Sequence, residues 1–402
     1  MKAVNVLFLS LSMYDTLEQH NIYTDLLREF KKNGDKIYAV CPVQRRTNKP
    51  TNLIEEENAS ILQVRTGNIT RTNLIEKGIS TMMIGYQFVS AVKKYYKGIT
   101  FDLILYPTPP ITLESVVRYF KKRDKAKTYL LLKDIFPQNA VDIGMMSKSG
   151  VKGILYKLFR KKEKKLYAIS DRIGCMSQAN VDYVLKHNPE VDPAKVEICA
   201  NSIEPQDMRV SAEERAALRE KYGIPQDKKV FVYGGNLGRP QGIPFLIECL
   251  RAEKENADAF FLVVGAGTEY GKLEAFVNEE KPANMKLLKC LPKEDYDRLV
   301  AACDVGLIFL DHRFTIPNFP SRLLAYMQAG LPVLAATDPN TDIGKVIVEG
   351  GFGWWCESND VQAFRAAVGD ALAADLSAVK EKEIAYLYEH YTVETAYKTI
   401  VK

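Results

Sequence analysis

Two loops in the second half of the sequence contain the residue types that bind a phosphate. The first, VYGGNLGRPQG over residues 232–242, has glycines directly after an apolar segment, where backbone N–H groups can approach an anion closely. Arg239 adds a planar guanidinium suited to a diphosphate. From these residues alone, a tight turn with an exposed arginine explains the loop equally well.

The second loop lies within residues 316–337 and predicts a short helix that starts at Pro320 and Ser321. Free amides at Ser321, Arg322 and Leu323, with the charge of Arg322, would form an anion site. A capped helix with a surface arginine is the alternative. Two candidate anion sites at the same end of one domain favour phosphate binding.

A third glycine loop, VVGAGTEYG over residues 263–271, contains G-x-G. Its third glycine is misplaced for a dinucleotide-binding fingerprint, so it is a weak NAD motif. We expect a sharp turn at Gly265 that borders the same cleft.

The elements that must position these loops alternate between short apolar strands and amphipathic helices. One series runs to about residue 200, and a second starts near residue 229. Strands that are apolar on both faces are typical of parallel sheets covered by helices. The sequence therefore predicts an α/β protein of two Rossmann-like, doubly wound domains, at 1–205 and 206–380, with a helical tail at 381–402 that returns to the first domain.

Length and composition agree with two soluble domains. The chain has 402 residues, 47% hydrophobic and 26% charged, and a net charge of only +5, which is too weak to indicate nucleic-acid binding. Seven cysteines occur singly, which favours a reducing compartment and excludes a zinc ribbon. No apolar stretch approaches the roughly 20 residues of a membrane span. We expect a cytoplasmic protein.

Four segments, in this order and spacing, resemble the nucleotide-binding domain of family 4 glycosyltransferases: GGNLGRPQG, VVGAGTEYGKLE, LPKEDYDRLVAACDVGLIFL and FPSRLLAYMQAGLPVLA. In the first half, LLKDIFPQNAVDIG resembles a segment of the branch that makes bacterial capsular and O-antigen surface polysaccharide. The resemblance implies a retaining enzyme of GT-B architecture, with two Rossmann-like domains facing a cleft that holds the donor.

The two loops and the resemblance together give the expected donor-binding residues: Gly235, Asn236, Arg239, Gln241, Gly265, Leu291, Phe319, Ser321, Arg322 and Leu323. Asn236 and Gln241 stand where the family places an arginine and a lysine on the diphosphate, so Arg239 would have to compensate. The main chain around Cys290 and Leu291 would pair with the base.

The family's paired glutamates fall at Pro317 and Ala325 in this sequence. The second glutamate normally holds the ribose, and alanine cannot accept a hydrogen bond. Ribose recognition must therefore be relocated or absent.

Asp134 is the expected catalytic carboxylate that orients or deprotonates the acceptor hydroxyl, although a helix cap or an ion pair with Lys133 explains it equally well. His20 could supply a second polar group, but a lone histidine near a helix start is more often structural.

The sequence contains no D-x-D metal motif. Helix N-termini, Arg239 and Arg322 would instead stabilise the leaving diphosphate, so we expect a metal-independent enzyme without a cofactor. The expected substrates are a nucleoside diphosphate sugar, with a UDP-sugar favoured, and a hydroxyl acceptor, which the resemblance implies is a lipid-linked saccharide.

The segment 151–167 predicts a basic helix with one apolar face, formed by Val151, Ile154, Leu155, Leu158 and Phe159. Such a helix could rest on the anionic inner face of the cell membrane. An ordinary surface helix whose apolar stripe meets the core is the alternative.

Two other functions compete with glycosyl transfer on this architecture. One is a UDP-sugar 2-epimerase, which would need no acceptor. The other is a transferase-like subunit without catalysis, which the two missing glutamates support.

Overall fold

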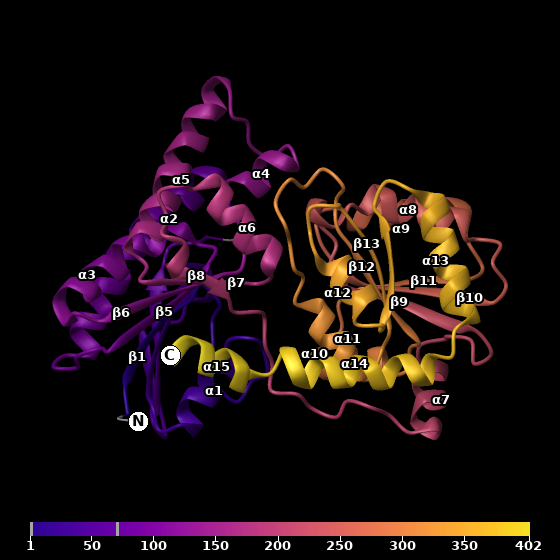
Figure 1. Cartoon of the computed structure of the whole chain (residues 1–402), viewed down its shortest axis with the longest axis horizontal. Coiled ribbons are helices and arrows are strands. Elements are labelled where there is room, and N and C mark those ends of the chain that lie inside the picture. Colours follow the sequence, from indigo (N-terminus) through magenta and orange to yellow (C-terminus); the bar gives the residue numbers. More distant parts are fainter. Residues whose placement is uncertain (1–2, 70–71) are drawn as a thin grey trace. The chain divides into compact units, whose positions relative to one another are not determined.

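The computed structural model describes residues 3–69 and 72–402, except the side chains of Leu74, Ile75, Lys77, Val151 and Lys152. The chain forms two compact units (Figure 1). The first comprises Met1–Glu204 and Val393–Lys402, and the second comprises Pro205–Thr392.

The sheet of the first unit has the strand order β3-β4-β2-β1-β5-β6-β7-β8. Its strands are β1 (Asn5–Leu9), β2 (Lys36–Gln44), β3 (Asn52–Glu56), β4 (Ala59–Thr66), β5 (Leu103–Thr108), β6 (Lys127–Leu132), β7 (Arg172–Cys175) and β8 (Val196–Ile198). In the described part of this sheet, every strand pairing is parallel except that of β3 with β4, an edge hairpin that the sequence analysis did not identify. Asn58 makes its turn with a left-handed φ of 53°, which asparagine tolerates.

The helices of the first unit are α1 (Thr24–Lys32), α2 (Leu74–Tyr95), α3 (Glu114–Asp124), α4 (Gln138–Asp142), α5 (Gly150–Ile169), α6 (Gln178–His187) and α15 (Val393–Val401), with 3-10 turns η1 (Arg45–Thr47), η2 (Ile111–Leu113) and η3 (Pro193–Lys195). The last helix, α15, lies beside α1 (Figure 1). The rings of Phe30 and Tyr397 meet edge to face at 4.8 Å, and the Tyr397 hydroxyl donates to Asp35 at 3.2 Å. Burial of these rings fixes the chain terminus to the first sheet.

The sheet of the second unit is parallel, with the order β11-β10-β9-β12-β13-β14. Its strands are β9 (Lys229–Asn236), β10 (Ala259–Ala266), β11 (Met285–Leu288), β12 (Val305–Phe309), β13 (Val333–Thr337) and β14 (Gly353–Glu357). The central strands β12 and β13 are buried along their whole length, as expected for strands covered by helices on both faces. Two α/β units built on parallel sheets are therefore confirmed.

The helices of the second unit are α7 (Ala212–Lys221), α8 (Ile243–Ala252), α9 (Tyr270–Glu280), α10 (Lys293–Ala301), α11 (Arg322–Ala329), α12 (Ile343–Glu349), α13 (Val361–Ala373) and α14 (Leu376–His390), with the 3-10 turn η4 (Arg239–Gln241). Helix α14 packs against α11 and so belongs to the second unit. The return to the first unit therefore begins at Val393 rather than at residue 381 as expected, because α14 packs on α11 whereas α15 packs on α1.

Candidate active site

The carboxyl ends of β9 and β10 lie side by side, with Gly235 opposite Gly265. A Cβ atom on Gly265 would lie 2.0 Å from the carbonyl oxygen of Gly235, and one on Gly267 would lie 2.2 Å from that of Leu237. Only glycine allows two strand-end loops to approach so closely. Gly265 thus packs the loops together at the sheet edge where open parallel sheets bind ligands.

Arg322, the first residue of α11, lies against the end of β9. Its guanidinium carbon is 4.3 Å from the centre of the Tyr233 ring. Gly235 has a φ of +116°, and a Cβ atom there would lie 3.1 Å from Arg322 Nη2. The Tyr233 hydroxyl turns back to donate to the carbonyl oxygen of Asn236 at 2.8 Å. Tyr233 therefore connects both expected phosphate loops.

Tyr326, one helical turn after Arg322, anchors the start of α11 beneath the sheet edge. Its buried hydroxyl lies 3.1 Å from the carbonyl oxygens of both Val232 and Leu307, and it accepts the Gly234 N–H at 3.3 Å. Because residues four apart share a helix face, this anchor also fixes the position of Arg322.

Tyr296, from α10, covers the other side of β9. A Cβ atom on Gly234 would lie 1.7 Å from the Tyr296 hydroxyl, so only glycine fits between them. Burial raises the pKa of Tyr296 to about 12, although the charge of Arg322 opposes the shift. The phenol is therefore a neutral hydrogen-bonding group at physiological pH. The sequence analysis did not identify Tyr233, Tyr296 or Tyr326. The Arg-x-x-x-Tyr spacing of α11 could have indicated Tyr326.

The charge of Arg322 has no carboxylate partner within 4.0 Å among residues 3–69 and 72–402, although the side chain is half-buried. A partly desolvated guanidinium without a counter-ion is costly, and an anion bound beside it would relieve that cost. The adjacent glycine backbone and a helix N-terminus favour the same sign of charge. This arrangement has the charge and the backbone donors that an anion would need.

The N-terminus of α11 offers fewer free amides than expected. Leu323 donates its N–H to the carbonyl oxygen of Pro320 at 3.2 Å, so this amide is not free, which corrects the expectation. The cause is a tight first turn, in which Leu324 likewise bonds Ser321 at 3.1 Å. Ser321 is exposed and makes no side-chain cap.

Asn236 and Gln241 bond each other. Asn236 Nδ2 donates to Gln241 Oε1 at 3.1 Å, and the Gly238 N–H reaches the same oxygen at 3.2 Å. Arg239 is 56% exposed, and its Nε lies 3.9 Å from Glu269 Oε1. The sequence analysis expected Arg239 to converge with Arg322, whereas in the structure a nearby carboxylate compensates its charge.

Leu291 and Phe319, the remaining expected donor residues, have apolar side chains and offer polar groups only through the main chain. Leu291 is half-buried in the loop between β11 and α10, next to Cys290, whose thiol is exposed. Phe319 and Leu323 are core side chains, 4% and 0% exposed. Ala325 is half-buried and presents only a methyl group.

A buried carboxyl group directly after β13 helps to hold the loop between β12 and α11. Asp338 Oδ1 accepts the amides of Asn340 and Thr341 at 2.9 and 3.2 Å, which closes a tight turn. The side chains of these two residues bond the carbonyl oxygens of Phe314 and Asn318. Burial raises the pKa of Asp338 to about 6.

Asp134 follows β6 at the carboxyl edge of the first sheet. Its Oδ2 accepts from Asn139 Nδ2 at 2.6 Å, while Oδ1 is buried without a hydrogen-bond partner. Burial raises the pKa of Asp134 to about 6, which suits proton transfer near neutrality. The alternative ion pair is not formed, because Lys133 Nζ lies 3.4 Å from the carbonyl oxygens of Cys199 and Ala200.

His20 belongs to a different network. Its Nδ1 lies 2.7 Å from Arg28 Nη2 and 3.2 Å from Asp25 Oδ1, and buried Asp25 accepts the Glu204 N–H at 3.1 Å. Strand β5 separates β1, which precedes His20, from β6, which precedes Asp134. This geometry favours the structural interpretation of His20. Its network connects α1 to Glu204, the last residue of the first unit before the chain enters the second.

Comparisons with known proteins agree with this geometry. Residues 214–387 match the family model "Glycosyl transferases group 1". A Pseudomonas aeruginosa protein named "Probable glycosyltransferase WbjE" is 26% identical over 325 residues, 80% of this chain and 78% of the relative. The sequence match covers most of the second unit and extends into the first.

Solved structures match nearly the whole chain. Sucrose-phosphate synthase from Thermosynechococcus elongatus has a TM-score of 0.75 at 15% identity and covers 99% of this chain and 97% of its own. Anabaena HepE, solved with UDP and glucose, has a TM-score of 0.70 at 15% identity, with coverage of 99% and 98%. These likenesses confirm the GT-B fold.

Over residues 214–387 the chain is thus similar to group 1 glycosyltransferases, and it has the GT-B fold. Pro317 and Ala325 stand where the resemblance to family 4 glycosyltransferases implies two glutamates. No cluster of three or more potential metal ligands occurs in the described part of the chain.

Helix α5 displays an apolar patch beside its lysines. Ile154, Leu155 and Leu158 are 70%, 45% and 51% exposed, whereas Phe159 packs on Phe136 with ring centres 5.1 Å apart. Val151, the fifth residue expected on this face, has its side chain outside the described residues. Among the described helices, none is long and apolar enough to cross a membrane.

Proposed function

We propose that this chain is a glycosyltransferase that transfers a sugar from a UDP-sugar to the hydroxyl group of a lipid-linked saccharide. The observation that supports a diphosphate-bearing donor is Arg322, a half-buried guanidinium without a carboxylate partner among the described residues, held on Tyr233 beside the glycine backbone of β9. HepE was solved with UDP-glucose as well as with UDP, which supports uridine as the base.

In the proposed reaction, the bond between the anomeric carbon and the diphosphate oxygen breaks, and a bond from that carbon to the acceptor oxygen forms. Arg322 and the amides near Gly235 stabilise the negative charge that grows on the diphosphate. Asp134 takes the proton of the acceptor hydroxyl, since its raised pKa suits a base near neutrality. The family resemblance supports retention of the anomeric configuration and a reaction without a metal ion.

We further propose a place in surface polysaccharide synthesis on the inner face of the cell membrane. The name of a partial relative supports it: Escherichia coli K12 WcaI, 26% identical over 160 residues, is named for colanic acid biosynthesis. The exposed leucines and lysines of α5 would rest on anionic lipid, close to a lipid-linked acceptor.

The test is a transfer assay with the purified full chain, a bacterial lipid-linked saccharide fraction and radiolabelled sugars of UDP, GDP and ADP. We expect label to enter the lipid fraction from a UDP-sugar, with or without EDTA, and the product to keep the donor's anomeric configuration by NMR. Conversion of the UDP-sugar without acceptor would indicate a 2-epimerase. No turnover with any donor, despite UDP binding, would indicate a subunit without catalysis.

A further inference from the structure

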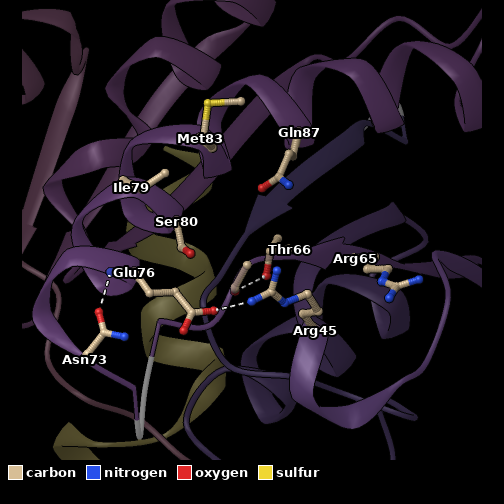
Figure 2. Close-up of a pocket in the computed structure, with 10 residues that line it drawn as sticks. Arg45, Arg65, Thr66, Asn73, Glu76, Ile79, Ser80, Met83 and Gln87 are labelled. Carbon is tan, nitrogen blue, oxygen red and sulfur yellow. Dashed lines mark hydrogen bonds and ion pairs between the residues drawn. The ribbon is translucent and has the colours of Figure 1, made fainter.

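A pocket of about 1300 Å³ opens in the first unit beyond the carboxyl ends of β2 and β4 (Figure 2). Arg45 follows β2, and Arg65 and Thr66 end β4. The other wall is helix α2. All of its lining residues belong to the first unit, so it is separate from the Arg322 site of the second unit, and Asp134 is not among them.

Close packing of the backbone on α2 shapes this pocket. A Cβ atom on Gly67, directly after β4, would lie 2.1 Å from Ser80 Oγ, so only glycine lets the chain pass there. Asn73 caps the helix by accepting the Glu76 N–H at 2.8 Å. The first turns of α2 are therefore fixed beside the ends of the strands.

One face of α2 presents both polar and apolar side chains to the pocket. Glu76, Ile79, Ser80, Met83 and Gln87 follow the spacing of a single helix face. Such a face is uniformly apolar when it packs on a core. A mixed face fits a ligand that has both hydroxyl groups and apolar carbon–hydrogen surface.

Gln87 has an unsatisfied acceptor at this wall. Its Oε1 is buried and has no hydrogen-bond partner. In Figure 2 the side chains of Gln87 and Ser80 point from α2 toward the strand ends. A buried acceptor without a partner is costly, and a ligand hydroxyl can supply the missing bond.

Among the described residues that line the pocket, Arg45 is paired with a carboxylate and Arg65 is not. Glu76 accepts from Arg45 at 2.9 Å and from Asn68 at 2.8 Å, and hydrogen bonds from Thr72 and Asn68 together with Arg45 hold the pKa of Glu76 below its usual value. Arg65, at the outer edge in Figure 2, is exposed and makes no ion pair with any carboxylate in residues 3–69 and 72–402. The rim therefore offers a positive charge to a ligand.

We propose that this pocket binds an anionic saccharide unit of the acceptor, bearing a carboxylate or phosphate. The inference rests on the proposed transferase function. Arg65 pairs with the acidic group, Gln87 and Ser80 bond ring hydroxyls, and the sugar's apolar face lies on Ile79 and Met83, which are 60% and 46% exposed.

The test compares methyl glucuronide with methyl glucoside, its neutral counterpart, in binding titrations by NMR with the full chain. We expect the glucuronide to bind more tightly. Arg65→Gln should raise the Kd of the glucuronide about tenfold without changing that of the glucoside. Gln87→Leu should weaken both sugars alike and fold normally, because it removes an unpaired buried oxygen.

Arg118→Gln is the matched control, since Arg118 is 58% exposed on α3 and does not line the pocket. Unchanged binding in both Arg65→Gln and Gln87→Leu would overturn the proposal. Loss of phosphatidylglycerol vesicle binding in Arg65→Gln, without binding of either sugar, would assign the pocket to a lipid headgroup and also overturn it. UDP titrations of the same samples test the donor site independently, so failure of UDP binding would refute the proposed function and not the pocket.

Discussion

The guanidinium carbon of Arg322 lies 4.3 Å from the centre of the Tyr233 ring, while the hydroxyl of the same tyrosine donates to the carbonyl oxygen of Asn236 at 2.8 Å. A single buried side chain thus supports the cation of one loop and the backbone of the other. Cation–π contact orients a guanidinium without neutralising it, which leaves the charge available to a ligand.

Substitutions of Tyr233 should separate these two contacts. Tyr233→Phe keeps the ring but loses the hydroxyl bond, so we expect about 1 kcal/mol lower stability and a Kd for UDP raised about fivefold. Tyr233→Leu also loses the ring beneath Arg322 and should weaken UDP binding further. Denaturant unfolding and calorimetry measure both effects. Tyr222→Phe on the same unit is the control, and equal behaviour of Tyr222→Phe and Tyr233→Leu would contradict the account.

Asp134 should impose a pH dependence on stability. Burial raises its pKa from 3.8 to about 6, so the folded state binds the proton more tightly than the unfolded chain. This group therefore costs stability progressively as pH rises from about 4 to 6. As pH rises from 4 to 7, the unfolding free energy of Asp134→Asn should therefore increase by on the order of 2 kcal/mol relative to that of the wild type. Denaturant unfolding measures both proteins at both pH values. If the unfolding free energies of variant and wild type differ equally at pH 4 and pH 7, the raised pKa is wrong.

The same variant should test the proposed base. We expect the wild-type kcat/KM to rise with pH through about 6 and Asp134→Asn to lose about 100-fold with the Kd for UDP unchanged. Asp142→Asn, which alters the nearby bond from Gln138, serves as the control and should keep its activity. Wild-type rates in Asp134→Asn would refute its role in proton transfer.

Cys290 offers a natural probe of the loop that we propose binds the base. Its thiol is exposed, whereas the other cysteines of the chain are buried. If the main chain near Leu291 pairs with uracil, UDP should slow alkylation of Cys290 by iodoacetamide several-fold, as peptide mass spectrometry can measure. Inorganic diphosphate, which lacks a base, should not protect it. Equal protection by both compounds would mean that the base lies elsewhere.

Membrane association should depend on the lysines beside the exposed patch of α5. Changing Lys157, Lys161 and Lys165 to glutamine removes three exposed charges from one helix face. We expect binding to phosphatidylglycerol vesicles in a sedimentation assay to fall at least tenfold, at about 1 kcal/mol per charge.

Lys122, Lys125 and Lys127, also exposed, provide a control of equal charge near the end of α3. Their replacement by glutamine should leave most of the vesicle binding. Equal losses in the two triple variants would indicate attraction by net charge alone and would contradict a role for the α5 patch.

Local signals explain why the main elements of the second unit could be predicted. Pro320 and Ser321 precede α11 as expected, and Gly330, with a φ of +65°, ends it. The glycines after β9 likewise lie at the carboxyl edge of a parallel sheet. Each of these features depends on a few neighbouring residues.

Side-chain partners could not be predicted, because they come from distant parts of the chain. Glu269 lies beside Arg239 only after β10 has paired with β9, and Tyr326 reaches Val232 and Leu307 only through the packed sheet. The edge hairpin was missed for a related reason, since β3 is half-exposed and lacks the apolar run of a buried strand.

The central claim is that Arg322 holds the β-phosphate of the donor, and calorimetric titration of UDP and UMP tests it most directly. We predict that the wild type binds UDP more tightly than UMP and that Arg322→Gln removes most of this difference, a change of about 10- to 100-fold in Kd. Arg239→Gln, which alters an exposed arginine near Glu269, should change it less than about threefold. Wild-type affinity for UDP in Arg322→Gln, with the loss appearing in Arg239→Gln instead, would contradict the account.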